Sequence, residues 1–146
     1  MRRLPAFLAL AIMAGNAGAQ IPFLRSRTPA QPVLQGIDAL RADFAAQSGG
    51  TTIYYGSDSV VLGAPARAVL AAQAAWLRRH PEVVVRIEGY GDAGDTRDHA
   101  LAVGARRAEA ARDYVVLLGV PAAQISTTSW GKERPGLGRA VTILLR

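Results

Sequence analysis

Few side chains in this sequence could act as a nucleophile, a general acid or a general base. His80 and His99 are the only imidazoles, and no serine stands in the Gly-x-Ser-x-Gly frame of a nucleophile elbow. His80 is expected at a helix end beside Pro81, and His99 on the solvated surface of a helix. There is no cysteine, so no thiolate nucleophile is available. We therefore expect no enzyme, and a hydrolase that depends on His99 is a remote third function.

Metal binding has equally little support. Asp92, Asp95 and Asp98 stand close together, but their spacing of three differs from the odd-position ligands of an EF-hand. No glutamate closes the set with a bidentate carboxylate. The lack of cysteine also excludes a thiolate zinc site and a thiol-linked lipid anchor. We expect no metal and no cofactor.

Composition indicates one globular domain with tails. The chain has 146 residues, of which 50% are hydrophobic and 19% charged, which excludes a disordered polyelectrolyte. Lysine and arginine number 17 against 11 acidic residues, so the formal charge is +6. These cations are scattered and are not interleaved with aromatic residues, as a base-stacking surface would require. We therefore expect no nucleic-acid partner.

Residues 1–19 have the three-part pattern of a cleaved secretory signal. Met1-Arg2-Arg3 is a positive head, residues 4–15 form an apolar run, and Ala17-Gly18-Ala19 supplies small residues for cleavage. The run is shorter than the ~20 residues that a membrane-spanning helix needs. We expect export to the periplasm, with no lipid anchor or transmembrane segment in the mature chain and with any attachment to the outer membrane peripheral.

Helix-breaking and strand-breaking residues, together with the spacing of the apolar residues, divide the remaining chain into segments. Residues 20–50 are expected to form a tether that carries a short helix over 37–47, and residues 51–146 a folded domain. The expected elements are a strand over 51–55, a helix over 65–79, a strand over 83–90, a helix from about Asp98 to Leu118, and strands over 125–130 and 140–145. This β-α-β-α-β-β order favours an α/β (α+β) sandwich, with two helices covering one face of a mixed sheet.

Short motifs lie on this pattern in a fixed order. Gly89-Tyr90-Gly91-Asp92 ends a strand, Ala105-Arg106-Arg107-Ala108 lies in the next helix, and Trp130-Gly131-Lys132-Glu133-Arg134-Pro135 follows the third strand. In this order they resemble the OmpA-like domain, which is shared by the C-terminal part of OmpA, the peptidoglycan-associated lipoprotein and MotB. The resemblance covers roughly Thr51 to Arg146 and implies the fold of that family.

The resemblance also implies a ligand. OmpA-like domains hold peptidoglycan non-covalently through the diaminopimelate of its stem peptides. The binding aspartate of the family corresponds to Asp92 and the binding arginine to Arg107, whereas Arg106 is expected to be solvated. Asp92 would accept from the ligand ammonium, and Arg107 would donate two N–H groups to the carboxylate on the same carbon. Tyr90 and Gly91 are candidate rim residues.

The sequence departs from the family pattern around these residues. Ala100 stands where the family has asparagine, Gly91 replaces threonine or alanine, and Asp95 replaces glycine. The segment before the last strand is shortened to 136–138 and lacks the family's asparagine. Two functions therefore stay open. One is non-catalytic binding of the peptidoglycan stem peptide. The alternative is a degenerate domain that binds an outer-membrane or periplasmic envelope protein without binding peptidoglycan.

Overall fold

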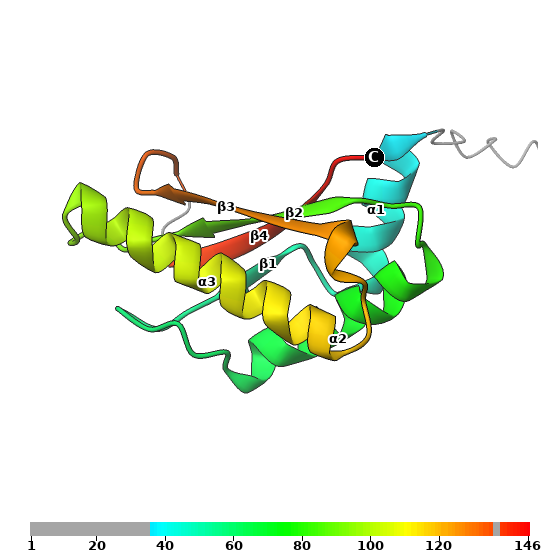
Figure 1. Cartoon of the computed structure of the whole chain (residues 1–146), viewed down its shortest axis with the longest axis horizontal. Coiled ribbons are helices and arrows are strands. Elements are labelled where there is room, and N and C mark those ends of the chain that lie inside the picture. Colours follow the sequence, from blue (N-terminus) through cyan, green and yellow to red (C-terminus); the bar gives the residue numbers. More distant parts are fainter. Residues whose placement is uncertain (1–35, 136–137) are drawn as a thin grey trace, which may run out of the picture. The chain divides into compact units, whose positions relative to one another are not determined.

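The computed structural model describes residues 36–135 and 138–146 (Figure 1). Its elements are α1 (Ile37–Gln47), β1 (Thr52–Tyr54), α2 (Ala64–Arg79), β2 (Val85–Tyr90), α3 (Arg97–Leu117), a 3-10 turn η1 (Ala122–Gln124), β3 (Ile125–Gly131) and β4 (Arg139–Leu144). The expected signal peptide, 1–19, and the expected tether as far as residue 35 lie outside the described residues. Within the described ranges, no helix combines the length and the apolar character needed to cross a membrane.

The four strands form one mixed sheet in the order β1-β4-β2-β3. β2 pairs in parallel with β3 and antiparallel with β4, and β4 pairs antiparallel with β1. β2 begins at Val85, two residues later than expected, because the Val83 N–H bonds to the His80 carbonyl in the preceding turn. The mixed sheet and the α+β class expected from the sequence are confirmed. β2 is an inner strand, and its carboxyl end lies beside the end of β3.

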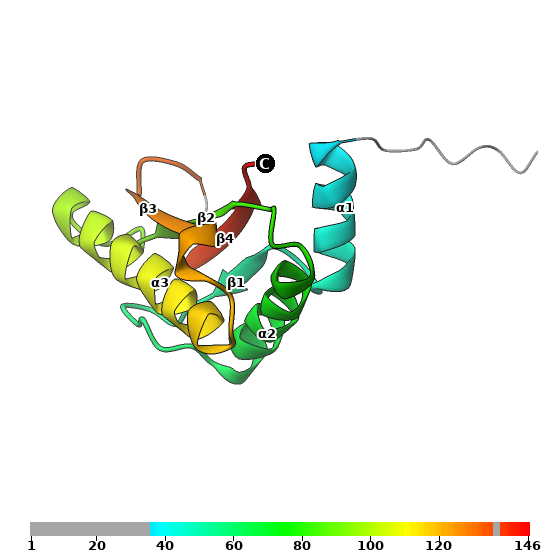
Figure 2. The ribbon, with the colours of Figure 1, turned by 45° about the vertical axis from the view of Figure 1, so that its right-hand side comes forward.

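The helices α2 and α3 lie on the same face of the sheet, as expected (Figures 1 and 2). Pro65 stands in the first turn of α2, where its missing N–H costs no intrahelical bond. The Thr96 hydroxyl caps α3 by accepting from the backbone N–H of His99 at 3.2 Å. Apolar side chains of both helices fill the core against the sheet, among them Leu70, Ala74, Leu77, Ala108, Ala111 and Val115.

The helix α1 precedes the segment expected to form the domain and packs against α2. The buried Phe44 ring meets the Trp76 ring edge-on, with centroids 5.1 Å apart. The Trp76 indole N–H donates to the Asp43 carboxylate at 2.7 Å and holds the pKa of Asp43 below its ordinary value. The short helix expected over 37–47 is therefore present, and it adds an aromatic contact to the core.

Two glycines set how closely α3 approaches β2. A Cβ atom on Gly89 would overlap the carbonyl group of Gly104, and a Cβ atom on Gly104 would overlap the Ser129 hydroxyl. Only hydrogen fits at both positions, so the helix backbone lies directly on the strand backbone. Arg107 follows Gly104 by one helical turn, and this close approach brings its side chain to the end of β2.

Candidate ligand-binding site

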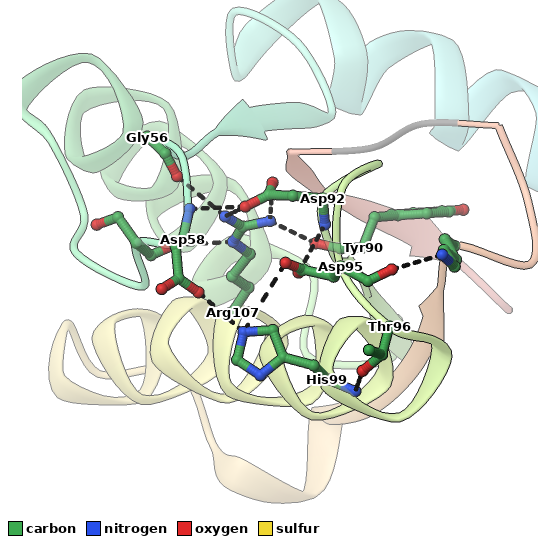
Figure 3. A network of polar contacts seen from close by, with 10 residues as sticks. Gly56, Asp58, Tyr90, Asp92, Asp95, Thr96, His99 and Arg107 are labelled. Carbon is green, nitrogen blue, oxygen red and sulfur yellow. Dashed lines mark hydrogen bonds and ion pairs between the residues drawn. The ribbon is translucent and has the colours of Figure 1, made fainter.

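The two residues expected to bind the ligand lie together at the carboxyl end of β2 (Figure 3). Asp92 follows the last residue of β2 by two positions, and Arg107 projects from α3. Gly91 lies against Ala100, because a Cβ on Gly91 would stand 2.5 Å from the Ala100 carbonyl oxygen and 2.6 Å from its Cα. The two closest atoms belong to the backbone of residue 100, so the contact requires glycine at position 91 whatever side chain stands at position 100. The glycine lets the start of α3 lie against the loop that carries Asp92.

Asp92 and Arg107 form a bidentate ion pair. Nη1 donates to Oδ1 at 2.9 Å, and Nη2 donates to Oδ2 at 3.2 Å. The Arg107 side chain is fully buried, whereas the Asp92 side chain is 21% exposed. The hydrogen bonds from Arg107 hold the pKa of the Asp92 carboxyl below its ordinary 3.8, against the opposing effect of desolvation. The stability contributed by the ionised pair is therefore present at neutral pH and is lost as the pH falls through this lowered pKa.

Every N–H group of Arg107 has an acceptor inside the domain. Besides the two bonds to Asp92, Nη1 donates to the Tyr90 carbonyl at 2.8 Å and Nη2 to the Gly56 carbonyl at 3.0 Å. Nε donates to the Ser59 carbonyl at 2.8 Å. A guanidinium carries five N–H donors, so the set is complete. Arg107 thus joins α3 to the end of β2 and to the loop that follows β1, and the expectation of two N–H groups free for a ligand does not describe this state.

The turn Gly56–Ser59 lies over the guanidinium and also contacts Asp92. The N–H of Asp58 donates to Asp92 Oδ2 at 2.6 Å. Asp58 has a φ of +49°, a left-handed conformation that aspartate tolerates better than most residues. Its carboxylate lies 3.0 Å from Nε2 of His99 on α3. The turn is therefore tied both to the loop after β2 and to the first turn of α3.

Asp58, Asp95 and His99 form a group beside this pair in which Asp58 and His99 are exposed and Asp95 is partly buried. Each offers one ligand atom, and these atoms lie within 4.8 Å of one another, so the group is one that could hold a metal ion. The hydrogen bond with Asp58 and the charge of Asp95 raise the pKa of His99 above 6.5. Attraction between the protonated His99 and the two carboxylates therefore explains why the three side chains lie together. Stability from this attraction is present while His99 is protonated and is lost as the pH rises through the raised pKa. Of Asp92, Asp95 and Asp98, whose spacing differs from that of an EF-hand calcium loop, only Asp95 belongs to this group.

The two candidate rim residues contribute through the backbone. Tyr90 is 5% exposed, and its hydroxyl lies 3.3 Å from the Glu88 carboxylate. Its carbonyl is the part that reaches Arg107. Gly91 is buried under Ala100, and its own N–H and C=O bond to Gly131 and Gly138. Tyr90 therefore contacts Arg107 through its carbonyl while its hydroxyl is paired with Glu88, and Gly91 contributes backbone bonds only.

Sequence reasoning did not identify the turn Gly56–Ser59 as part of the site. Its contribution comes from the carbonyls of Gly56 and Ser59 and the N–H of Asp58, which every non-proline residue possesses. Residue types therefore carried no signal for these contacts. His99, expected as a solvated residue, is exposed but paired with Asp58. Arg106 is exposed, as expected.

Comparison with known proteins gives this site a family context. A family model described as the OmpA family matches residues 54–140. The peptidoglycan-associated lipoprotein of Mesorhizobium japonicum is 36% identical over 142 residues, covering 92% of this chain and 82% of that protein. Its counterpart in Rhizobium meliloti is 46% identical over 86 residues, covering 59% of this chain and 49% of that protein. The chain thus spans about half the length of the latter relative.

Solved structures show the same fold. The peptidoglycan-associated lipoprotein from Burkholderia pseudomallei matches with a TM-score of 0.63 and 33% identity, covering 66% of this chain and 91% of that chain. The C-terminal domain of Helicobacter pylori MotB matches with a TM-score of 0.60 and 16% identity, covering 65% and 84%. At that low identity the second match concerns the fold alone. The family resemblance and the fold expected from the sequence are both confirmed.

Proposed function

The chain belongs to the OmpA family, which is non-enzymatic, and from this premise we propose that it binds peptidoglycan without covalent attachment. The proposed ligand group is the diaminopimelate of the stem peptide. The single observation that carries the proposal is the pairing of Asp92 with Arg107 at the end of β2. The similarity to proteins named as peptidoglycan-associated lipoproteins supports it.

The chemistry of the ligand suits this pair. The far end of diaminopimelate carries an ammonium and a carboxylate on one carbon, so it needs an anion and a cation side by side. Asp92 is the anion and keeps part of its surface in solvent, while Arg107 is the cation held beside it. Each charge-assisted hydrogen bond contributes about 1.5–3 kcal/mol. A single site would therefore bind modestly, and a polymer that offers many stem peptides compensates through multivalency.

A competition experiment tests the choice of ligand. The protein is bound to purified diaminopimelate-type sacculi and displaced with a soluble stem peptide that contains either diaminopimelate or lysine. Lysine lacks the second carboxylate, so we expect the diaminopimelate peptide to compete at about 10-fold or more lower concentration, the effect of one lost charge-assisted contact. Equal competition by both peptides would show that Arg107 does not bind the second carboxylate of diaminopimelate.

A second candidate function is a module that binds an envelope protein and no peptidoglycan. One observation favours it, namely that all five N–H groups of Arg107 are already bonded within the domain. This candidate predicts a stable envelope-protein partner in a crosslinking pull-down, together with no retention of the protein on sacculi. Retention that depends on Asp92 would exclude it.

The proposed location follows from the proposed ligand. We place the protein in the periplasm, exported by the signal peptide expected over residues 1–19. The relatives are named lipoproteins, whereas this sequence contains no cysteine. In this proposal the protein is held in the envelope by its contacts with peptidoglycan or with a protein partner, and not by a lipid.

A further inference from the structure

We propose that the turn Gly56–Ser59, here called the strap, occupies the ligand site as an internal substitute for the zwitterion and must move aside before the stem peptide binds. The inference rests on the proposed function and adds a regulated step to it. In the closed state, the strap presents two carbonyl oxygens to Arg107 and one N–H group to Asp92. A ligand carboxylate would replace the carbonyls, and a ligand ammonium would replace the N–H group.

The positions of the donors on Arg107 support this substitution. A guanidinium offers two forks to a carboxylate, one formed by Nη1 and Nη2 and the other by Nε and Nη2. Asp92 takes the first fork with both of its oxygens. The second fork is taken by the Ser59 carbonyl on Nε at 2.8 Å and the Gly56 carbonyl on Nη2 at 3.0 Å. Two carbonyl oxygens thus stand where the two oxygens of one ligand carboxylate would bind, and Asp92 need not leave Arg107.

The same movement frees Asp92. Its Oδ2 accepts a hydrogen bond from the Asp58 N–H at 2.6 Å. When the strap moves aside, Oδ2 becomes free to accept a hydrogen bond from the ligand. Anion and cation therefore become available in one step, side by side, as a zwitterion requires. The exchange also favours the ligand on Arg107, because a charged carboxylate makes stronger hydrogen bonds than neutral carbonyls. The displaced carbonyls and the N–H group then bond to water.

The strap has the character of a segment that opens locally. Gly56, Ser57 and Asp58 are exposed, so lifting them uncovers little apolar surface. Outside its bonds to Arg107 and Asp92, the strap is held by the contact of the Asp58 carboxylate with Nε2 of His99, at 3.0 Å. The Asp58 side chain is 70% exposed and the His99 side chain 49%. Because the open state is only partly populated, the apparent affinity for the ligand is reduced by the fraction of molecules that are closed.

The variant Asp58→Asn tests this proposal in the full chain. Asparagine tolerates the left-handed backbone and keeps the N–H group, but it removes the charge that faces His99. Affinity is measured by titration with a soluble stem peptide that contains diaminopimelate. We expect the variant to bind about two- to fivefold more tightly than the wild type, the effect of weakening one exposed ion pair that holds the closed state. The control is Asp38→Asn, which removes an exposed ion pair with Arg41 on α1 and should leave binding unchanged. Unchanged or weaker binding by Asp58→Asn would overturn the proposal.

A second measurement follows the strap itself. Hydrogen exchange at the Asp58 amide, monitored by NMR, should be slowed by its bond to Asp92 in the free protein. In the saturated complex we expect this exchange to be about fivefold faster or more, because the strap is displaced. Exchange that is unchanged or slower in the complex would overturn the proposed displacement of the strap without contradicting peptidoglycan binding. If the wild type binds no stem peptide and no sacculi, the proposed function fails, and the strap fails with it.

Discussion

Replacing Arg107 with alanine is expected to lower the free energy of unfolding by about 3–5 kcal/mol, the range found when one partner of a buried ion pair is removed. The substitution takes away all five donors at once. It leaves the Asp92 carboxylate and the carbonyls of Gly56, Ser59 and Tyr90 without their partner, in surroundings where only part of the site reaches water. Urea denaturation followed by circular dichroism measures the change.

The neighbouring arginine provides a matched control. Arg106 lies on the same helix but is exposed, so Arg106→Ala should change the free energy of unfolding by no more than about 0.5 kcal/mol. Arg107→Lys should recover only part of the loss, because a lysine ammonium cannot reproduce the planar fork held by Asp92. Equal stability losses at positions 106 and 107 would contradict the role given to Arg107 in joining the three segments.

Replacing Gly89 with alanine is expected to destabilise the protein by about 3 kcal/mol, at the upper end of the range for overpacked cores. The added Cβ would overlap the backbone carbonyl of Gly104, and backbone cannot turn away as a flexible side chain can. The helix α3 must then lift from β2, which pulls Arg107 away from the Tyr90 carbonyl. We therefore expect sacculus binding to weaken together with stability, as measured by co-sedimentation and by thermal denaturation.

Gly94 supplies the control for this substitution. It lies in the loop before α3, outside the left-handed region, and a Cβ there would meet no atom within 4 Å. Gly94→Ala should leave both stability and sacculus retention close to the wild type. A Gly89→Ala protein as stable as Gly94→Ala would mean that the close contact between α3 and β2 does not position the site.

The fold could be predicted well because it depends on the spacing of apolar side chains, which can be seen directly in the sequence. The apolar spacing along α3 and the β-branched strands on either side of it were sufficient to indicate the elements and their order. The predicted apolar stripe of this helix was Leu101, Ala105, Ala108, Ala111, Val115 and Leu118; Ala108, Ala111 and Val115 are buried, whereas Leu101 is exposed. The segment over 37–47 was recognised as a helix from Ile37, Leu40 and Phe44. Its packing through Phe44 on Trp76 joins residues 32 positions apart, and periodicity alone does not report contacts of that range.

The site could be predicted only in part. The motif order placed Asp92 and Arg107 correctly with respect to each other, and the structure brings them within 2.9 Å. The strap could not be predicted, because its contacts use backbone groups that carry no residue signature. Ala100 and Gly91 looked like two losses from the family pattern. In the structure the glycine at position 91 is explained by its close approach to the backbone of the buried Ala100, a contact that the sequence pattern does not report.

Retention on purified diaminopimelate-type sacculi is the most direct test of the central claim, that peptidoglycan binds at Asp92 and Arg107. The wild type is compared with Asp92→Asn, which keeps the shape of the side chain and removes the charge that would meet the ligand ammonium. Asp98→Asn, an exposed carboxylate in the first turn of α3, is the control. We expect Asp92→Asn to bind about 10-fold or more weakly than the wild type while remaining folded, and Asp98→Asn to bind like the wild type. Full retention of folded Asp92→Asn would place the contact with the polymer elsewhere on the domain and would contradict the assigned site.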